Sequence, residues 1–67
     1  MTAAEFEVLS ESEAEKIIAW RFHELSNAGY EVDDALCLAT HTEIDLHVAA
    51  DLIRRGCPPK TAFRILI

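Results

Sequence analysis

The sequence predicts a small all-α protein, and three observations lead to that class. Its 67 residues suffice for one domain at most, because a chain this short buries only about 60% of the surface that its unfolded form exposes. Apolar residues make up 51% of the composition, enough for a core, whereas glycine and proline number only two each. The chain also lacks the alternating runs of β-branched and aromatic residues that are typical of strands. We therefore expect a bundle of short helices.

The first helix is expected to follow a flexible N-terminal tail. Residues 1–9 are too few to carry a helical stripe that could dock, so we assign residues 10–67 to the helical domain. Ser10 and Glu13 fit a capping box, which places the start of the helix near Ser10. Gly29 is expected to end it in a left-handed C-cap. Between these ends, apolar residues recur at steps of three and four: Ala14, Ile17, Ile18, Phe22, Leu25 and Ala28.

Two residues of this helix do not follow the simple pattern. Arg21 falls within the apolar stripe, and we expect its aliphatic stem to be buried while its guanidinium group reaches water. Trp20 falls off the stripe, on the flank that carries Glu13 and Glu24. Its indole is predicted either to form an interface with a partner or to be covered by the tail or by the last helix.

Two shorter helices are expected in the middle of the chain. The second begins at Glu31, where acids in the first turn complement the helix dipole, and ends around Thr40. The third follows Asp45, a good N-cap residue, and stops at Gly56. We expect the inward face of the second to be Val32, Ala35, Leu36 and Ala39, and that of the third to be Leu46, Ala49, Ala50 and Ile53.

A fourth, two-turn helix is expected after Pro58 and Pro59, because proline is favoured at the first helical position. A helix this short is not stable alone in water, so we expect it to dock on the rest of the domain or on a partner. Its apolar side should consist of Ala62, Phe63, Leu66 and Ile67. Core packing of these side chains is favoured over a dimer contact, since so small a bundle needs every apolar residue.

The charge of the chain narrows the class of partner. The formal net charge of the chain is −6. Residues 1–34 alone have a net charge of −7, because their nine acidic residues are offset only by Lys16 and Arg21. Nucleic acid is therefore not an expected partner, since phosphate binding needs clustered Lys and Arg. No apolar run approaches the roughly 18 residues that span a bilayer, and the N-terminus has acids where a signal peptide has bases. We expect a cytoplasmic protein.

Neither catalysis nor metal binding is expected. Cys37, His41, His47 and Cys57 are of the ligand types that zinc prefers, but their spacing matches no standard finger pattern. They are interpreted as free thiols and surface histidines. No third group that could orient a Cys–His nucleophilic pair is identifiable. We therefore expect no cofactor, no metal and no enzymatic activity.

A resemblance to a known family covers about half of the chain. The residues that carry it are Leu25, the turn Ala28-Gly29-Tyr30, the pairs Ala35-Leu36 and Leu38-Ala39, and the segment 45–53. Their order and spacing resemble the ubiquitin-associated (UBA-like) three-helix domain. The resemblance implies a three-helix bundle, here with an added C-terminal helix, whose function is to bind another protein. The chain departs from the family in having Ala28 in place of the usual methionine and in the added helix, which would cover the family's binding surface if it docked there.

The resemblance also implies where the partner binds. In the UBA-like family an apolar patch forms between the first turn and the end of the third helix, which corresponds here to Ala28, Gly29, Tyr30, Leu52 and Ile53. We add Trp20 to this set because exposed tryptophan is enriched at interfaces. The predicted function is a non-catalytic module that binds an unidentified protein. The alternative is a self-associating, homodimeric helical subunit of a larger assembly.

Overall fold

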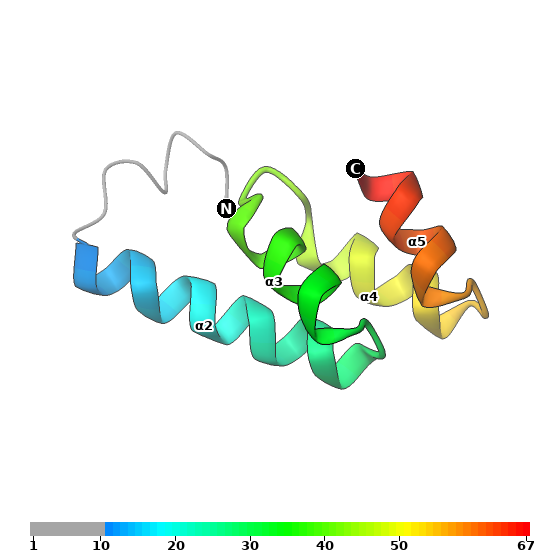
Figure 1. Cartoon of the computed structure of the whole chain (residues 1–67), viewed down its shortest axis with the longest axis horizontal. Helices are drawn as coiled ribbons and strands as arrows, with labels where there is room; N and C mark the ends of the chain where they lie inside the picture. The colour runs from blue at the N-terminus through cyan, green and yellow to red at the C-terminus, as the bar shows by residue number, and fades with distance from the viewer. Residues whose placement is uncertain (1–10) are drawn as a thin grey trace.

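The computed structural model describes residues 11–67, and this part of the chain forms four helices and no strand (Figure 1). The helices are α2 (Glu11–Ala28), α3 (Val32–Thr40), α4 (Leu46–Arg54) and α5 (Pro59–Leu66). The all-α helical bundle predicted from the sequence is confirmed. The predicted tail, residues 1–9, and the predicted cap at Ser10 lie outside the described residues.

The helices end where local chemistry predicts. The backbone of Gly29 takes a φ of +129°, and its N–H donates to the carbonyl of Leu25 at 3.3 Å and to that of Ser26 at 3.2 Å. A side-chain oxygen of Asp45 accepts a hydrogen bond from the N–H of His47 at 2.8 Å, which is the expected N-cap of α4. Pro59 occupies the first turn of α5.

Helix α2 is twice as long as α3 or α4, with 18 residues against nine in each of the others. At 1.5 Å per residue it spans about 27 Å, compared with about 13 Å for α3. Helices α3 and α4 both pack against α2, and α5 packs against α4. Figure 1 shows the N-terminal turns of α2 extending past the other labelled helices. The N-terminal half of α2 therefore presents side chains that the other described helices cover only in part.

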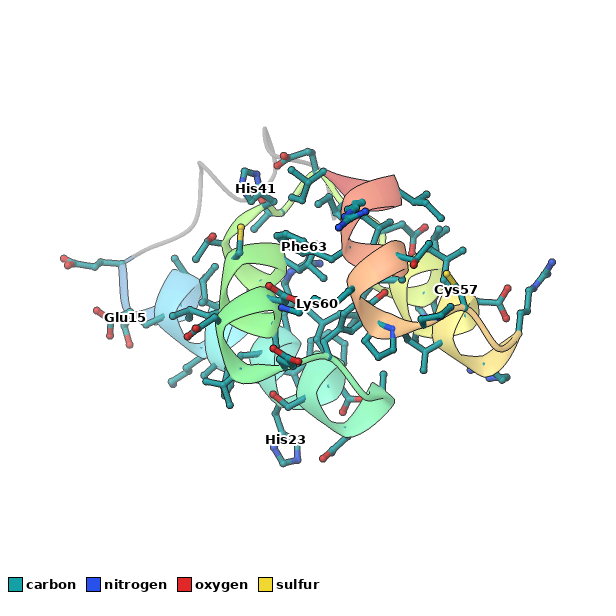
Figure 2. All side chains as sticks on the ribbon, turned by 45° about the vertical axis from the view of Figure 1, so that its right-hand side comes forward. Glu15, His23, His41, Cys57, Lys60 and Phe63 are labelled. Carbon is teal, nitrogen blue, oxygen red and sulfur yellow. The ribbon has the colours of Figure 1, made fainter. Side chains whose placement is uncertain are left out.

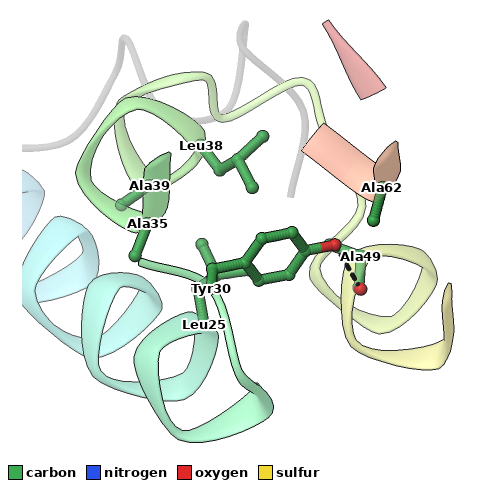
Figure 3. Packing of buried hydrophobic residues seen from close by; sticks show 7 residues of the cluster. All are labelled: Leu25, Tyr30, Ala35, Leu38, Ala39, Ala49 and Ala62. Carbon is green, nitrogen blue, oxygen red and sulfur yellow. Dashed lines mark hydrogen bonds between the residues drawn. The ribbon is translucent and has the colours of Figure 1, made fainter. Parts of the chain in front are cut away.

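The core of the bundle is small and built largely from alanine (Figure 3). Among residues 11–67, seven apolar residues are buried: Leu25, Tyr30, Ala35, Leu38, Ala39, Ala49 and Ala62. Because four of the seven are alanines, the helix backbones can approach one another closely. Larger side chains such as Ile18, Phe22 and Leu52 pack around this centre but stay partly exposed. The bundle thus leaves much apolar surface at its periphery.

The predicted inward face of α3 is only half right. Ala35 and Ala39 are fully buried, but Val32 is 65% exposed and Leu36 is 51% exposed. Their places on the inner side of α3 are taken by Leu38 and Asp34. Apolar residues lie on more than one side of this helix, so periodicity alone does not determine which side packs.

Helix α5 docks on the body of the domain, as its short length predicts. Ala62 is fully buried, and Lys60 Nζ lies 2.9 Å from Asp34 Oδ2 and 3.0 Å from Glu31 Oε2. These two hydrogen bonds raise the pKa of Lys60 above its ordinary value. In Figure 2 Lys60 reaches from α5 to α3. The prediction that Ile67 packs inward is wrong: its side chain is 60% exposed, beyond the last turn of the helix.

Candidate protein-binding site

Arg21 is the most unexpected side chain of the structure. The sequence predicts that its guanidinium group reaches water, but the residue is only 5% exposed. Its Nε donates to the carbonyl of Ala39 at 3.1 Å, and its Nη2 lies within hydrogen-bonding distance of three more carbonyls, those of Leu38 (3.4 Å), His41 (3.2 Å) and Ile44 (2.8 Å). The charged group is therefore solvated by backbone oxygens in place of water.

These contacts give Arg21 a defined structural role. The carbonyls of Leu38 and Ala39 lie in the last turn of α3, where backbone oxygens lack partners within the helix and the dipole favours a cation. The carbonyls of His41 and Ile44 belong to the loop before α4. Burial lowers the pKa of Arg21, and the nearby carboxylates of Glu43 and Asp45 oppose this shift. Arg21 thus caps α3 and fixes the following loop against α2.

The fixed loop forms one wall of a groove beside Trp20. This cavity of about 510 Å³ lies between α2 and the start of α4, and we call it the Trp20 groove. Its lining residues are Ile17, Trp20, Arg21, Glu43, Ile44, Asp45, Leu46 and His47. Trp20 is 56% exposed, so α5 does not cover it, and the predicted tail, residues 1–9, lies outside the described residues. A large aromatic ring on a rigid helix, next to a concave apolar surface, is suited to holding a side chain of another molecule.

Two carboxylates form the rim of the Trp20 groove. The pKa of Glu43 is lowered, chiefly by a hydrogen bond from its own backbone N–H and then by His41, whose Nδ1 lies 3.0 Å from Glu43 Oε1. The pKa of Asp45 is lowered mainly by the N–H of His47. The side chains of Glu43 and Asp45 are 59% and 63% exposed. Both groups are therefore ionised and accessible at neutral pH.

The residues that the family resemblance implies do not form one open patch. Tyr30 is 4% exposed, and its hydroxyl donates to the carbonyl of Ala49 in α4 at 2.7 Å (Figure 3). Burial raises its pKa, and Cys57 adds to that shift. The ring of Tyr30 fills the core between the α2–α3 turn and α4, so it is not part of the exposed surface of this structure.

The remaining family positions lie at the C-terminal end of α2 and in α4, whereas Trp20 lies near the middle of α2. Gly29 is exposed and packs close to Ile53: a Cβ atom at Gly29 would lie 3.4 Å from Ile53 Cγ2. Ala28, Leu52 and Ile53 are half-buried and pack against the core. Trp20 precedes Gly29 by nine residues, which is about 13 Å along a helix. The structure therefore separates the sequence-predicted site into a small turn surface and the Trp20 groove.

A second groove lies on α2 and α3, with a volume of about 460 Å³. We call it the α2–α3 groove, and its lining residues are Glu11, Ala14, Glu15, Ile18, Ala19, Phe22 and Leu36. The apolar stripe of α2 and the expected inward face of α3 include Ile18, Phe22 and Leu36, so the sequence does not predict this surface. The signal that could have revealed it is the length of the apolar stripe on α2, which is longer than either nine-residue helix that packs on it.

Within residues 11–67, no three His, Cys, Asp or Glu side chains gather closely enough to hold a metal ion. Cys37 and Cys57 are free thiols, both half-buried. None of the helices in this part of the chain has the length and apolar character needed to cross a membrane.

No protein-family model, curated protein or solved structure matches this chain. The features that bear on its function are its own: the exposed Trp20, the carboxylates beside it, and the buried Arg21, which joins the two walls of the groove.

Proposed function

We propose that this chain is a small, non-catalytic protein–protein interaction module of UBA-like type, and that it holds its partner in the Trp20 groove. The observation that carries the proposal is the 56% exposure of Trp20 beside a groove of about 510 Å³. Tryptophan is the residue most enriched among those that dominate binding energy at interfaces. A half-exposed indole on a helix surface has a large apolar area in contact with water, and a partner that covers this area stabilises the complex.

The frame around Trp20 favours binding without large rearrangement. Arg21, the next residue, is held by carbonyls of α3 and of the loop that forms the opposite wall. Two of its four hydrogen bonds join α2 to the last turn of α3, and the other two join α2 to the loop before α4. A preformed groove loses less conformational entropy on binding than a flexible one, so more of the contact energy appears as affinity.

The UBA-like assignment is supported by features of α2, α3 and α4. The turn Ala28-Gly29-Tyr30 connects the first two of these helices, Gly29 lies against Ile53 near the end of the third, and Tyr30 bonds to Ala49 within it. These are the positions on which the sequence resemblance depends. The burial of Tyr30 leaves the family's usual binding surface smaller, which is a further reason to assign binding to the Trp20 groove.

The proposal is tested by affinity capture from a cell lysate followed by mass spectrometry. Wild-type protein is compared with Trp20→Ala and with Ile65→Ala, a control that removes another exposed apolar side chain, 62% exposed, from α5. Circular dichroism first establishes that both variants are folded. We expect Trp20→Ala to lose the captured partner by about 30-fold, the effect of a residue worth at least ~2 kcal/mol, and Ile65→Ala to retain it.

Two results would contradict the proposal. Capture of the same partner by Trp20→Ala at wild-type yield would show that binding occurs elsewhere, and the variant Leu52→Ala would then test the turn surface. Sedimentation that shows a concentration-dependent dimer broken by Trp20→Ala would assign the Trp20 groove to self-association, the alternative function.

A further inference from the structure

We propose that the Trp20 groove binds a basic segment of the partner protein, in which a Lys or Arg side chain lies over the indole of Trp20 between the carboxylates of Glu43 and Asp45. This inference rests on the proposed function and adds the chemistry of the partner. It follows from the signs and accessibility of the charges that line the groove.

Two carboxylates that a ligand can reach line the Trp20 groove, together with the exposed imidazole of His47, whose Nδ1 lies 3.6 Å from Asp45 Oδ1. Glu43 and Asp45 are more than half exposed, and both carboxyl pKa values are lowered, so both carry their negative charge at neutral pH. The one arginine in the lining, Arg21, is 5% exposed and donates its hydrogen bonds to backbone carbonyls. Its charge is thus buried, and an anionic ligand would meet two exposed carboxylates first.

Trp20 favours the same sign of ligand. The face of an indole ring is negative, and it attracts an ammonium or guanidinium group more strongly than the rings of Tyr or Phe do. The apolar lining residues Ile17 and Leu46 can pack against the aliphatic stem of the same Lys or Arg side chain. The groove therefore offers an apolar floor for the stem, a π face and two carboxylates for the charge.

The charge of the whole chain acts in the same direction. The formal net charge is −6, which increases the association rate with a basic partner and decreases it with an acidic one. Nucleic acid and anionic lipid surfaces carry the wrong sign for this groove. A basic protein segment is the occupant whose charge is opposite both to the carboxylates of the groove and to the net charge of the chain.

The α2–α3 groove does not carry an equally specific inference. It has carboxylates, Glu11 and Glu15, but the aromatic ring that lines it, Phe22, is half-buried, whereas Trp20 is 56% exposed. Nothing in the described residues shows what covers it.

The test uses three synthetic peptides that differ only in charge: Ac-Ala-Leu-Lys-Arg-Leu-Ala-NH2, the same peptide with two glutamines in place of the basic pair, and the same with two glutamates. Each is titrated into the full chain while the emission of Trp20, the only tryptophan, is recorded. We expect a saturable shift with the basic peptide, weaker binding of the glutamine peptide by about tenfold, and no response to the glutamate peptide.

Three variants assign the effect to residues. Glu43→Gln and Asp45→Asn remove one charge each, and asparagine retains the N-cap of α4, so both should fold. We expect each substitution to lower the affinity for the basic peptide by about threefold to tenfold. Asp33→Asn removes one charge from an exposed position of α3 that does not line the groove, and should change the affinity by less than about twofold at physiological salt.

The outcomes distinguish this inference from the proposed function. If the glutamine or glutamate peptide bound as tightly as the basic peptide and shifted the emission of Trp20, the inference of a basic segment would be overturned. The Trp20 groove would then remain the binding site. Absence of binding by all three peptides would also overturn the inference, while capture of a partner that is lost in Trp20→Ala would keep the proposed function.

Discussion

The Nε atom of Arg21 in α2 lies 3.1 Å from the carbonyl oxygen of Ala39 in α3, and both residues are buried. The contact joins residues 18 positions apart in the sequence and places a charged group where the apolar stripe of α2 would lead one to expect a hydrocarbon. Three further hydrogen bonds from Arg21, to the carbonyls of Leu38, His41 and Ile44, also connect α2 to the C-terminus of α3 and to the following loop. The Trp20 groove exists because these walls are held together.

Replacing Arg21 should therefore destabilise the domain strongly. Arg21→Met keeps most of the side-chain volume but removes the guanidinium donor from the carbonyl oxygens of Ala39 and Ile44, whereas those of Leu38 and His41 keep backbone N–H donors; we expect a loss of about 3 kcal/mol in the free energy of unfolding. Arg21→Lys should cost less than Arg21→Met, because an ammonium can satisfy some of the four carbonyls but lacks the planar fork of donors. Urea denaturation followed by circular dichroism measures both. Wild-type stability of Arg21→Met would show that water replaces the guanidinium without cost.

Removing the hydroxyl of Tyr30 should have a smaller effect. Tyr30→Phe keeps the ring in the core and deletes the hydrogen bond to the carbonyl of Ala49, so we expect a loss of about 1 kcal/mol in the free energy of unfolding. For a domain of this size, that lowers the melting temperature by roughly 4–8 °C. Thermal unfolding checks the value. An unchanged melting temperature would mean that the 2.7 Å hydrogen bond contributes nothing in solution.

Truncation after Gly56 should destabilise the remaining bundle. It removes the fully buried Ala62, the half-buried Phe63 and Leu66, and Lys60, which bridges to Glu31 and Asp34. Burying one apolar side chain of the size of phenylalanine or leucine contributes about 1.5–3 kcal/mol to the free energy of unfolding. Because about 1 kcal/mol corresponds to roughly 4–8 °C in a domain of this size, loss of α5 should lower the melting temperature by at least about 10 °C. The control is Ile65→Ala on the exposed side of α5. An unchanged melting temperature after truncation would show that α5 is not part of the core.

The N-cap of α4 makes stability depend on pH in the acid range. The pKa of Asp45 lies below its ordinary value of 3.8, so the folded state binds the proton less readily than the unfolded chain does. The resulting stabilisation is fully present above about pH 4 and is lost as the pH falls through the lower, folded-state pKa. Glu43 acts in the same direction. Asp45→Asn should make the decrease in stability below pH 4 shallower, as measured by urea midpoints. An equally steep decrease in this variant would assign the acid sensitivity to other carboxyl groups.

The ends of the helices could be predicted because capping chemistry is local. Gly29, Asp45 and Pro59 each specify a helix boundary through their own backbone or side-chain geometry, and the structure places the boundaries there. The docking of α5 also followed from a local argument, since a helix of eight residues needs a surface to pack on.

The orientation of side chains was harder to predict, because it depends on contacts between distant residues. Leu36 and Leu38 are both leucines of α3, yet the first is half exposed and the second fully buried. Arg21 was expected to reach water, since its partners are backbone carbonyls 17 to 23 residues away, and every sequence position has a carbonyl. Tyr30 was assigned to a surface because its partner, the Ala49 carbonyl, is equally invisible in the sequence.

The candidate site was predicted in part for the same reasons. Trp20 could be singled out because it falls off the apolar stripe of α2, and its exposure follows from that position. The opposite wall, formed by residues 43–47, has no periodicity that would place it beside Trp20. The hydrogen bonds of Arg21 to His41 and Ile44, and the packing of Ile44 and Leu46 against the core, bring that wall to α2.

The measurement that most directly tests the central claim is a titration of isotope-labelled protein with the captured partner, followed by two-dimensional NMR. The indole N–H of Trp20 gives a single resolved signal, because the chain has one tryptophan. We expect the largest shifts at this signal and at the backbone amides of Glu43, Asp45 and His47, with little change at Gly29. Shifts centred on Gly29 and Ile53, with the Trp20 indole unmoved, would contradict the assignment of binding to the Trp20 groove.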